Sequence, residues 1–294
     1  MDDAAQKRYN MMMGMLSHTE DRNTSVRSPF CYVGNKRSSL KEILPRLPVR
    51  AIYCEPFGGS GTVLLNRPRS EIDVFNDMCS GVVSFYRCIS NEDKMIRLIN
   101  RLGISLHSRE EFIFNKATWA QCDDDVERAA RWFYVQQFSF QGIGRNFGRT
   151  LTPPNQTWAM VESAFPNFRA VHERLKRVLI EQLDWRVCLK DFDKVDAVLY
   201  LDPPYVDTCV GAYKNMMTKT DHIEMCEKIM QMQAYVAVSG YSNQLYDSYN
   251  WDERHEWDMS DKMTAIGAAR GDDEQAHISR GNVKEVLWIK YSRT

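Results

Sequence analysis

Short apolar runs that stop at turn-forming residues alternate along this chain with segments of helical periodicity. Such runs end at Pro56, at Asn76-Asp77 and at Asp202-Pro203, as buried strands do when they enter loops. Between these runs, apolar residues recur at the spacing of a helix that packs on one face. The pattern predicts strands at 51–55, 71–75, 196–201, 234–239 and 285–291, and helical segments at 62–66, 82–102, 126–140, 168–178 and 222–232.

Strands that alternate with helices indicate a mainly parallel sheet with crossover connections, and hence an α/β fold. The middle of the chain interrupts this alternation with a helical, aromatic segment, VERAARWFYVQQFSF at 126–140. We interpret its aromatic side chains as helix core rather than as a stacking surface. The interruption predicts an inserted domain at 86–180, a main domain made of 28–85 and 181–294, and a flexible N-terminal tail at 1–27.

Composition excludes several classes of protein. Eight cysteines occur without a C-x-x-C pair, so we expect reduced thiols, no disulfide framework and no metal site. No apolar run of about 18 residues occurs, so we expect no membrane span. The first residues lack the basic start and apolar core of a signal peptide, and we therefore expect a cytoplasmic protein.

Charge is distributed unevenly along the chain. The net charge is −1, whereas nucleic-acid-binding proteins usually carry a basic footprint. Acids concentrate at 123–125 and 252–274, but Glu42 is the single acid in a basic stretch from 22 to 50. This stretch predicts either a local face that holds phosphates or an ordinary solvated surface. Its basic residues are Arg22, Arg27, Lys36, Arg37, Lys41, Arg46 and Arg50.

The first candidate for chemistry is the glycine cluster EPFGGSG at 55–61, which follows the first predicted strand. Glycine allows positive φ and close approach of a ligand to the backbone, and open parallel sheets bind ligands beyond the carboxyl ends of their strands. The next strand ends at Asp77, whose carboxylate could accept the hydroxyls of a ribose or cap a helix. An ordinary turn is the alternative interpretation of the glycines.

The second candidate is Asp202-Pro203-Pro204-Tyr205, directly after the strand DAVLYL. The exocyclic amine of adenine is a poor nucleophile, because its lone pair is delocalised into the ring. The Asp202 carboxylate and the Pro203 carbonyl can accept its two hydrogens and stabilise positive charge as the amine attacks a methyl sulfonium. Consecutive prolines stiffen the loop, and Tyr205 can stack on a base extruded from a duplex. Alone, the tetrapeptide could also be a proline turn.

The two motifs, in this order and separated by an insert, resemble the Dam-type family of DNA adenine methyltransferases, and the chain is also similar to stand-alone methylases of bacteriophages. The resemblance runs from about 28 to 291. It implies a Rossmann-like, S-adenosylmethionine-dependent methyltransferase sheet with an inserted helical target-recognition domain. It further implies methyl transfer to the N6 amine of a flipped adenine in double-stranded DNA, S-adenosylhomocysteine as product, no metal, and a monomer or weak dimer.

The resemblance also assigns roles to residues. YVGNK at 32–36 resembles an aromatic-x-Gly-x-Lys segment of the family, EPFGGSG resembles its glycine motif, and LDW at 183–185 falls where the family contacts the cofactor's adenine. The implied catalytic residues are Asp202, Pro203, Pro204 and Tyr205. The implied cofactor residues are Tyr32, Gly34, Lys36, Glu55, Pro56, Phe57, Gly58, Gly59, Ser60, Gly61, Asp77, Asp184, Trp185 and Asp202.

A DNA-contacting loop is implied by FSFQGIGRN at 138–146, which resembles the family's segment that enters DNA. Gln141 stands where the family usually has Asn and the loop is shorter, so recognition of GATC does not follow. Arg145 could pair with a guanine and Arg149 could hold a phosphate, or both could be surface arginines. The implied DNA-binding residues are Gln141, Arg145, Asn146 and Arg149.

Other functions on the same scaffold remain open from the sequence. Enzymes that methylate cytosine N4 favour Ser-Pro-Pro, and enzymes that methylate RNA or glutamine often carry Asn-Pro-Pro, so Asp202 favours adenine. A DNA-binding relic without activity is the third alternative, and the presence of Glu55, Gly61, Asp77 and Asp202 argues against it.

Overall fold

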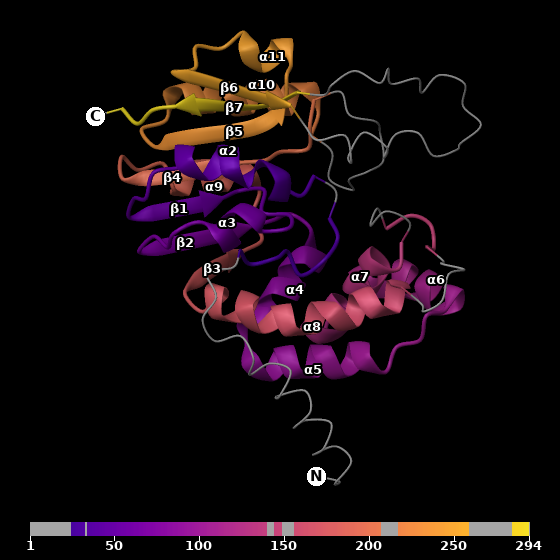
Figure 1. Ribbon diagram of the computed structural model, residues 1–294. Helices are drawn as coiled ribbons and strands as arrows, with labels where there is room; N and C mark the ends of the chain where they lie inside the picture. The colour runs from indigo at the N-terminus through magenta and orange to yellow at the C-terminus, as the bar shows by residue number, and fades with distance from the viewer. Residues whose placement is uncertain are drawn as a thin grey trace, which may run out of the picture. The chain divides into compact units, whose positions relative to one another are not determined.

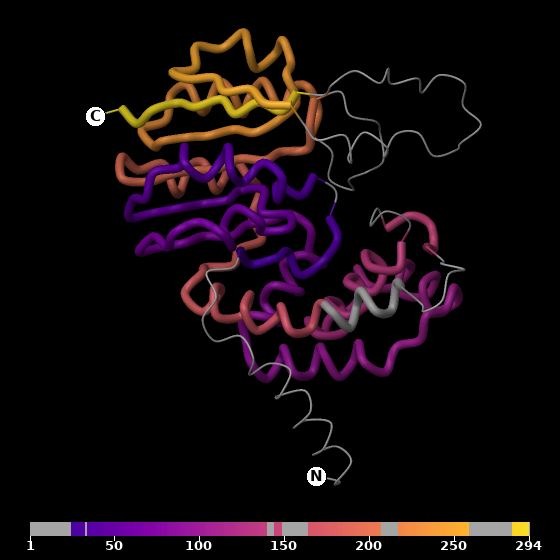
Figure 2. The backbone as a smooth tube through the Cα atoms, in the orientation of Figure 1, coloured from indigo at the N-terminus to yellow at the C-terminus, as the bar shows by residue number. Residues whose placement is uncertain are grey.

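The computed structural model describes residues 25–32, 34–139, 144–148, 156–206, 217–258 and 284–293, with the backbone alone at 156–163 (Figure 2). The chain folds into two compact units. The first, here called the sheet unit, comprises 34–59, 67–79 and 179–294, and the second, the helical unit, comprises 1–33, 60–66 and 80–178. The predicted division into tail, main domain and insert stays a prediction.

A seven-stranded sheet forms the centre of the sheet unit, in the order β3-β2-β1-β4-β5-β7-β6 (Figure 1). Strand β1 pairs in parallel with β2 and β4, and β4 pairs in parallel with β5. Strand β7 runs antiparallel to both β5 and β6. The strands are β1 Ile52–Glu55, β2 Ile72–Asn76, β3 Val178–Glu181, β4 Ala197–Leu201, β5 Tyr235–Tyr241, β6 Glu253–Asp258 and β7 Lys284–Lys290.

The strand order confirms the predicted α/β fold and locates a ligand crevice. From β1 the chain adds β2 on one side and later β4 on the other, so the order reverses between β1 and β4. In open α/β sheets, ligands bind outside the carboxyl ends of the strands at such a reversal. The glycine cluster follows β1 and the Asp202 tetrapeptide follows β4, so both candidate motifs border this position.

The two edge strands were missed by the sequence pattern. The helical periodicity extended to residue 178, but Val178 begins β3, and β6 lies within the acidic segment that starts at 252. Strand β3 is nowhere fully buried, and β6 alternates between half-buried and exposed residues. Because each lies at an edge of the sheet, neither needs the continuous apolar run that identified the inner strands.

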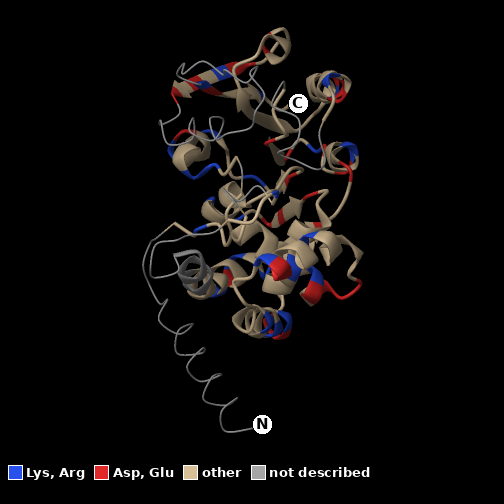
Figure 3. Ribbon diagram, turned by 90° about the vertical axis from the view of Figure 1, so that its right-hand side faces the viewer, with Lys and Arg blue, Asp and Glu red and all other residues tan. Residues whose placement is uncertain are grey.

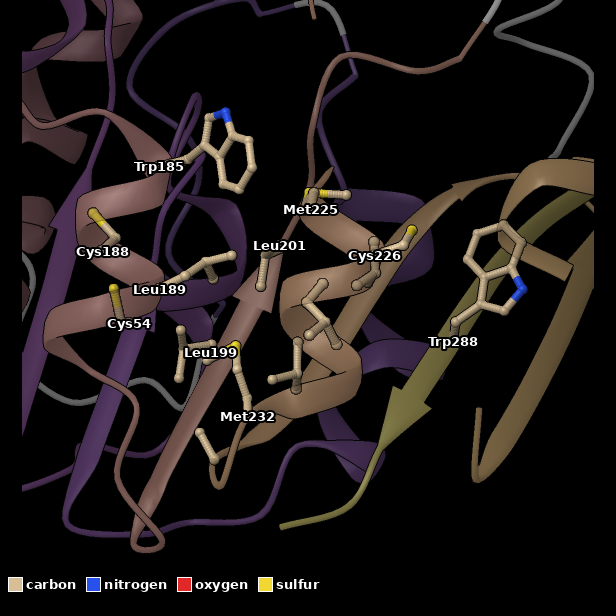
Figure 4. Packing of buried hydrophobic residues seen from close by; sticks show 14 of the residues in the cluster. Cys54, Trp185, Cys188, Leu189, Leu199, Leu201, Met225, Cys226, Met232 and Trp288 are labelled. Carbon is tan, nitrogen blue, oxygen red and sulfur yellow. The ribbon is translucent and has the colours of Figure 1, made fainter. Parts of the chain in front are cut away.

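The core of the sheet unit lies between the sheet and two helices, α9 and α10 (Figure 4). Trp185, Cys188 and Leu189 of α9 and Met225 and Cys226 of α10 pack there against the inner strands. Full burial of such an apolar side chain is worth about 1.5–3 kcal/mol. The helices of this unit are η1 Arg37–Ser39, α2 Leu40–Ile43, η2 Leu44–Arg46, α9 Trp185–Asp191, α10 Lys219–Gln231 and α11 Gln244–Asp247.

The helical unit has an aromatic core, as predicted for the segment at 126–140. Trp132, Phe133 and Phe138 are buried, and the ring of Phe133 stacks on that of Phe85 at 5.3 Å. The predicted helical segment at 82–102 is two helices, because the Asn91 side chain accepts the Lys94 amide and starts a new one. The helices are α3 Thr62–Asn66, α4 Ser80–Ser90, α5 Glu92–Gly103, α6 Arg109–Thr118, η3 Trp119–Gln121, α7 Asp125–Gln137 and α8 Gln156–Leu175.

The described part of the basic stretch, 25–32 and 34–50, does not form a uniform basic face, and Arg22 lies outside the described residues. Lys36 is 4% exposed, the Arg46 guanidinium donates to the main-chain oxygen of Glu42 at 2.5 Å, and Arg50 donates to that of Val195 at 2.6 Å. These three cations therefore make contacts within the sheet unit. Figure 3 shows positions of basic and acidic residues interleaved along the helices. Among the helices described, none is long and apolar enough to cross a membrane.

Candidate active site

The glycine loop after β1 depends on glycine at two neighbouring positions. A Cβ at Gly58 would lie 2.2 Å from the ring of Phe75, which is closer than two carbon atoms can approach. Gly59 has a backbone φ of +48°, a value that residues with a side chain rarely adopt. The Gly58 amide donates to the main-chain oxygen of Asn76 at 2.7 Å, so the loop folds back onto the end of β2. Both predicted glycines therefore have a steric reason to be there.

Two residues at the end of β2 hold this loop in place. The buried Asn76 side chain donates to the main-chain oxygens of Pro56 at 2.8 Å and Leu183 at 3.0 Å, and accepts the Leu183 amide at 2.7 Å. The Asp77 carboxylate accepts the amides of Gly59 at 2.8 Å and Cys79 at 2.7 Å. Burial raises the pKa of Asp77, although both amides oppose this rise. Asn76 joins three chain segments, and sequence reasoning missed that role.

The segment at 183–185 lies beside the glycine loop, because Asn76 binds both. Asp184 is the N-cap of α9, where its carboxylate accepts the Arg186 amide at 2.8 Å. Trp185 is 4% exposed, and its ring centroid lies 6.4 Å from that of Phe57. The structure thus brings together the sequence-predicted positions that follow β1, β2 and β3.

These residues fit a nucleoside-containing cofactor. Gly58 makes room for the ring of Phe75, and Gly59 supplies the positive φ of the loop. The Asp77 carboxylate, which can accept the hydroxyls of a ribose, is held in place by two amides. The half-buried ring of Phe57, which lies beside the buried Trp185, offers apolar surface of the kind that bases use. Glu55 is buried and accepts the Tyr53 hydroxyl at 2.6 Å, which fixes its carboxylate at the end of β1.

Asp202, the first residue after β4, has both carboxylate oxygens engaged. Its Oδ2 lies 2.6 Å from the Nζ of Lys36, and its Oδ1 accepts the Ser239 hydroxyl at 3.0 Å. Its side chain is 19% exposed, compared with 5% for Lys36. The Ser239 hydroxyl is also bonded to that of Tyr200 at 2.9 Å. The carboxylate predicted to be catalytic is therefore oriented from two sides, while part of it remains accessible.

Lys36 contacts four other residues of the site. Besides Asp202, its Nζ donates to the main-chain oxygen of Gly34 at 3.0 Å and to the Tyr205 hydroxyl at 2.7 Å, and it lies 3.5 Å from Oε1 of Glu285. Burial alone lowers the pKa of Lys36, but the charges on Asp202 and Glu285 raise it, and the net pKa lies above the usual value. Burial raises the pKa of Asp202, and Lys36 opposes that rise. Contact between Lys36 and the cofactor stays a prediction.

Tyr205 is held at its hydroxyl and at its ring. The hydroxyl accepts from Lys36 and donates to Oε1 of Glu285 at 3.1 Å. The ring meets that of Tyr241 edge to face, with centroids 4.3 Å apart. Pro203 is buried and Pro204 half-buried, as expected for a stiff loop. Stacking of Tyr205 on a base stays a prediction.

Glu285 belongs to the site but was recognised in the sequence only as part of a final strand. It is 1% exposed, and its Oε2 accepts the hydroxyl of Ser39, which in turn accepts the Trp257 indole N–H at 3.3 Å. A charged residue before the apolar run VLWI is typical of an exposed strand end, so the sequence offered no signal for its burial. Glu285 contacts Lys36 and Tyr205 because the fold brings β7 close to two segments that are distant from it in the sequence.

A family model of D12 class N6 adenine-specific DNA methyltransferases matches residues 32–263. The chain belongs to this family. This confirms the prediction of an adenine-specific DNA methyltransferase over the alternatives of cytosine or RNA methylation. The matched range includes the glycine loop, Lys36 and the Asp202 tetrapeptide of this methyltransferase.

Relatives of this D12 class methyltransferase include proteins named DNA adenine methylase. That of Salmonella typhi is 23% identical over 235 residues, covering 73% of this chain and 80% of the relative. That of Escherichia coli K12 is 22% identical over 244 residues, covering 76% and 83%. That of Vibrio cholerae is 28% identical over 116 residues, covering 39% and 42%. The predicted Dam-type resemblance is thus confirmed.

The candidate DNA-contacting residues lie in the helical unit of the methyltransferase. Arg145 and Asn146 are exposed and line a cavity of about 410 Å³, whereas Gln141 and Arg149 lie outside the described residues. The Lys116 ammonium donates to the main-chain oxygen of Arg145 at 2.6 Å. The other lining residues are Arg109, Phe112, Ile113, Lys116, Ala117 and Phe147.

Two cations of this cavity, Arg109 and Lys116, were missed by sequence reasoning. The guanidinium of Arg109 lies 5.1 Å from the ring centroid of Phe147. Arg109 and Lys116 are seven positions apart on α6 and therefore share one face of that helix, a signal that was present in the sequence.

The remaining predicted cofactor residues, Tyr32, Ser60 and Gly61, also belong to the helical unit. The main-chain oxygen of Ser60 accepts the Tyr86 hydroxyl at 2.6 Å, and Gly61 has φ +61°. Tyr32 packs edge to face on Phe30, with centroids 5.8 Å apart. Their contact with a cofactor stays a prediction.

Proposed function

We propose that this D12 class methyltransferase transfers a methyl group from S-adenosylmethionine to the N6 amine of an adenine flipped out of double-stranded DNA. The observation that carries the proposal is the geometry of Asp202. Its carboxylate lies after β4, beside the reversal of strand order, and is oriented by Lys36 and Ser239. A fixed, partly accessible acceptor at this position suits an amine that becomes positively charged as it reacts.

The cofactor residues would act through shape and hydrogen bonding. The backbone at Gly58 and Gly59 would lie against the cofactor, the Asp77 carboxylate would accept its ribose hydroxyls, and Trp185 with Phe57 would border its base. When bound, S-adenosylmethionine supplies an electrophilic methyl group on a sulfonium. Metal chemistry has no part in this proposal.

The amine would be held by two acceptors, the Asp202 carboxylate and the Pro203 main-chain oxygen. Holding both hydrogens favours the tetrahedral geometry that the nitrogen needs in order to attack. No general base is required before transfer, since the proton can leave once the nitrogen has become cationic. The base would have to leave the duplex, because an atom inside the stack cannot reach an enclosed site. Tyr205 would then stack on the extruded base.

The helical unit would contact the DNA. The cavity at Arg145 and Asn146 gathers further cations, Arg109 and Lys116, which suit phosphates and base edges. Gln141 and Arg149 are proposed as further contacts on the family resemblance alone. We also propose that the enzyme acts as a monomer or weak dimer on DNA in the cytoplasm of a bacterial or phage-infected cell.

The test is methyl transfer from labelled S-adenosylmethionine to duplex DNA, RNA and protein in parallel, followed by nucleoside analysis. The proposal expects label in N6-methyladenine from duplex DNA, and unchanged transfer in the presence of a metal chelator. Label confined to RNA or protein, or found in N4-methylcytosine, would refute the substrate assignment. Sequencing the methylated sites would then give the recognition sequence.

A further inference from the structure

We propose that Glu285 is a positioning residue for methyl transfer, which shares Lys36 with Asp202 and so leaves the site with a net negative charge where the amine reacts. The inference rests on the function proposed above and adds a residue to it. Glu285 lies at the start of β7, on the far side of β5 from β4 in the sheet order. It therefore reaches the site from a different strand and a distant part of the chain.

Glu285 is held by two hydroxyl donors and one ion pair, and its side chain is almost fully buried. It is 1% exposed, accepts the hydroxyls of Ser39 and Tyr205, and lies 3.5 Å from the Nζ of Lys36. Desolvation of a carboxylate strongly opposes folding unless hydrogen bonds and an opposite charge compensate. These contacts compensate it, and they tie Glu285 to two residues that also touch or adjoin Asp202.

The charges of the site explain what Glu285 contributes. One ammonium, Lys36, lies between two carboxylates, Asp202 and Glu285, so the three groups together carry one negative charge. If Lys36 had Asp202 as its single partner, the pair would be neutral. The amine gains positive charge during transfer, and a net negative site stabilises that change, because electrostatic interactions are strong where water is excluded.

The other groups near Asp202 do not supply this charge. Ser239 and Tyr241 face it from β5, Tyr200 from β4 and Tyr246 from α11. Burial raises the pKa of each of these tyrosines, so they stay neutral at physiological pH. Among the residues that the structure describes, the charged groups that face Asp202 are Lys36 and Glu285.

Glu285→Gln keeps the size of the side chain and removes its charge, and Glu227→Gln is the matched control at an exposed position of α10. Turnover and its pH dependence are measured with duplex DNA. For Glu285→Gln we expect kcat to fall at least about tenfold, with the KM values for cofactor and DNA nearly unchanged. The Glu227→Gln control should match the wild type.

The pH profile separates positioning from a purely structural role. Glu285 raises the pKa of Asp202 by like-charge repulsion, so its removal lowers that pKa, and the acidic limb of kcat moves to lower pH. A fall in thermal stability with raised KM and an unmoved acidic limb would overturn the inference. Glu285→Asp, which restores the charge, should recover part of kcat, and failure to do so would also contradict it.

The same assay distinguishes the inference from the proposed function. If the wild type methylates adenine and Glu285→Gln does so equally well, the inference fails and the function stands. If the wild type methylates no adenine, the function fails. Binding of S-adenosylhomocysteine by Glu285→Gln, compared with the wild type, verifies that the variant is folded.

Discussion

Two clusters of the sheet unit in which one cation meets several carboxylates, one around Lys36 and one around Arg186, differ in exposure. In the Lys36 cluster (Lys36, Asp202 and Glu285) the side chains are 5%, 19% and 1% exposed. In the Arg186 cluster (Arg186, Asp184, Asp221 and Glu224) they are 35%, 42%, 25% and 36% exposed. The shortest contacts are similar, 2.6 Å between Lys36 and Asp202 and 2.5 Å between Arg186 and Asp221. Distance alone therefore does not distinguish them.

The difference in burial changes how the charges of each cluster affect the free energy of folding. Water and salt screen the Arg186 cluster, which joins the start of α9 to α10 at the surface, and exposed pairs of this kind contribute about 0–1 kcal/mol. The Lys36 cluster is desolvated, which opposes folding unless every charge is matched. An enzyme keeps such an arrangement where its charge serves the reaction, and the Lys36 cluster includes the candidate catalytic carboxylate.

The largest effect is expected for Lys36→Met. This change leaves Asp202 and Glu285 buried without their cation, so the free energy of unfolding should fall by about 3–5 kcal/mol, and methyl transfer should be lost. Urea unfolding and the transfer assay measure the two effects. Lys41→Met is the matched control, since Lys41 is 81% exposed and 3.8 Å from Glu42. Equal stability of the two variants would erase the contrast between buried and exposed clusters.

The pH dependence of kcat should show the effect of burial on the catalytic carboxylate. Burial raises the pKa of Asp202, so protonation begins at higher pH than for a free aspartate of pKa about 3.9. As pH falls through this raised pKa, the carboxylate gains a proton and ceases to be an acceptor, so kcat declines. Single-turnover rates across the acidic range measure the limb. A decline confined to the range of free aspartate would mean that the Asp202 carboxylate is solvated in the working enzyme.

The smallest effect is expected for Arg186→Met. Methionine keeps apolar contact with the ring of Trp185, which the guanidinium carbon approaches to 4.3 Å from the centroid, while the ion pairs are lost. The free energy of unfolding should change by less than about 1 kcal/mol, because water already screens these charges. Urea unfolding at low and high salt tests this, and salt should shrink the difference further. A loss near that of Lys36→Met would show that exposure is a poor guide here.

Local chemistry explains what the sequence predicted well. The inner strands have continuous apolar runs, and the glycine cluster and the Asp202 tetrapeptide each occupy a few consecutive positions directly after such runs. The position of each motif at the end of a strand could therefore be predicted from neighbouring residues alone. The edge strand β6 has no apolar run, and it was missed for that reason.

The Lys36 cluster could not be assembled from sequence. Lys36, Asp202 and Glu285 come from three distant parts of the chain, and each has an ordinary local explanation as a loop cation, a turn acid or a strand-end charge. Glu285 reaches the other two because β7 lies next to β5, an antiparallel addition to a parallel sheet. Asn76 was missed for a related reason, since its bond to Leu183 joins segments 107 positions apart.

The most direct test of the account compares Asp202→Asn with the wild type in two measurements on the same protein, single-turnover methyl transfer to adenine in duplex DNA and binding of S-adenosylhomocysteine. The account predicts a transfer rate lower by about 10²–10³-fold, while the Kd stays within about threefold of the wild type. Transfer at a rate near that of the wild type would contradict the catalytic role of Asp202. So would a loss of transfer that weakened cofactor binding fully explains.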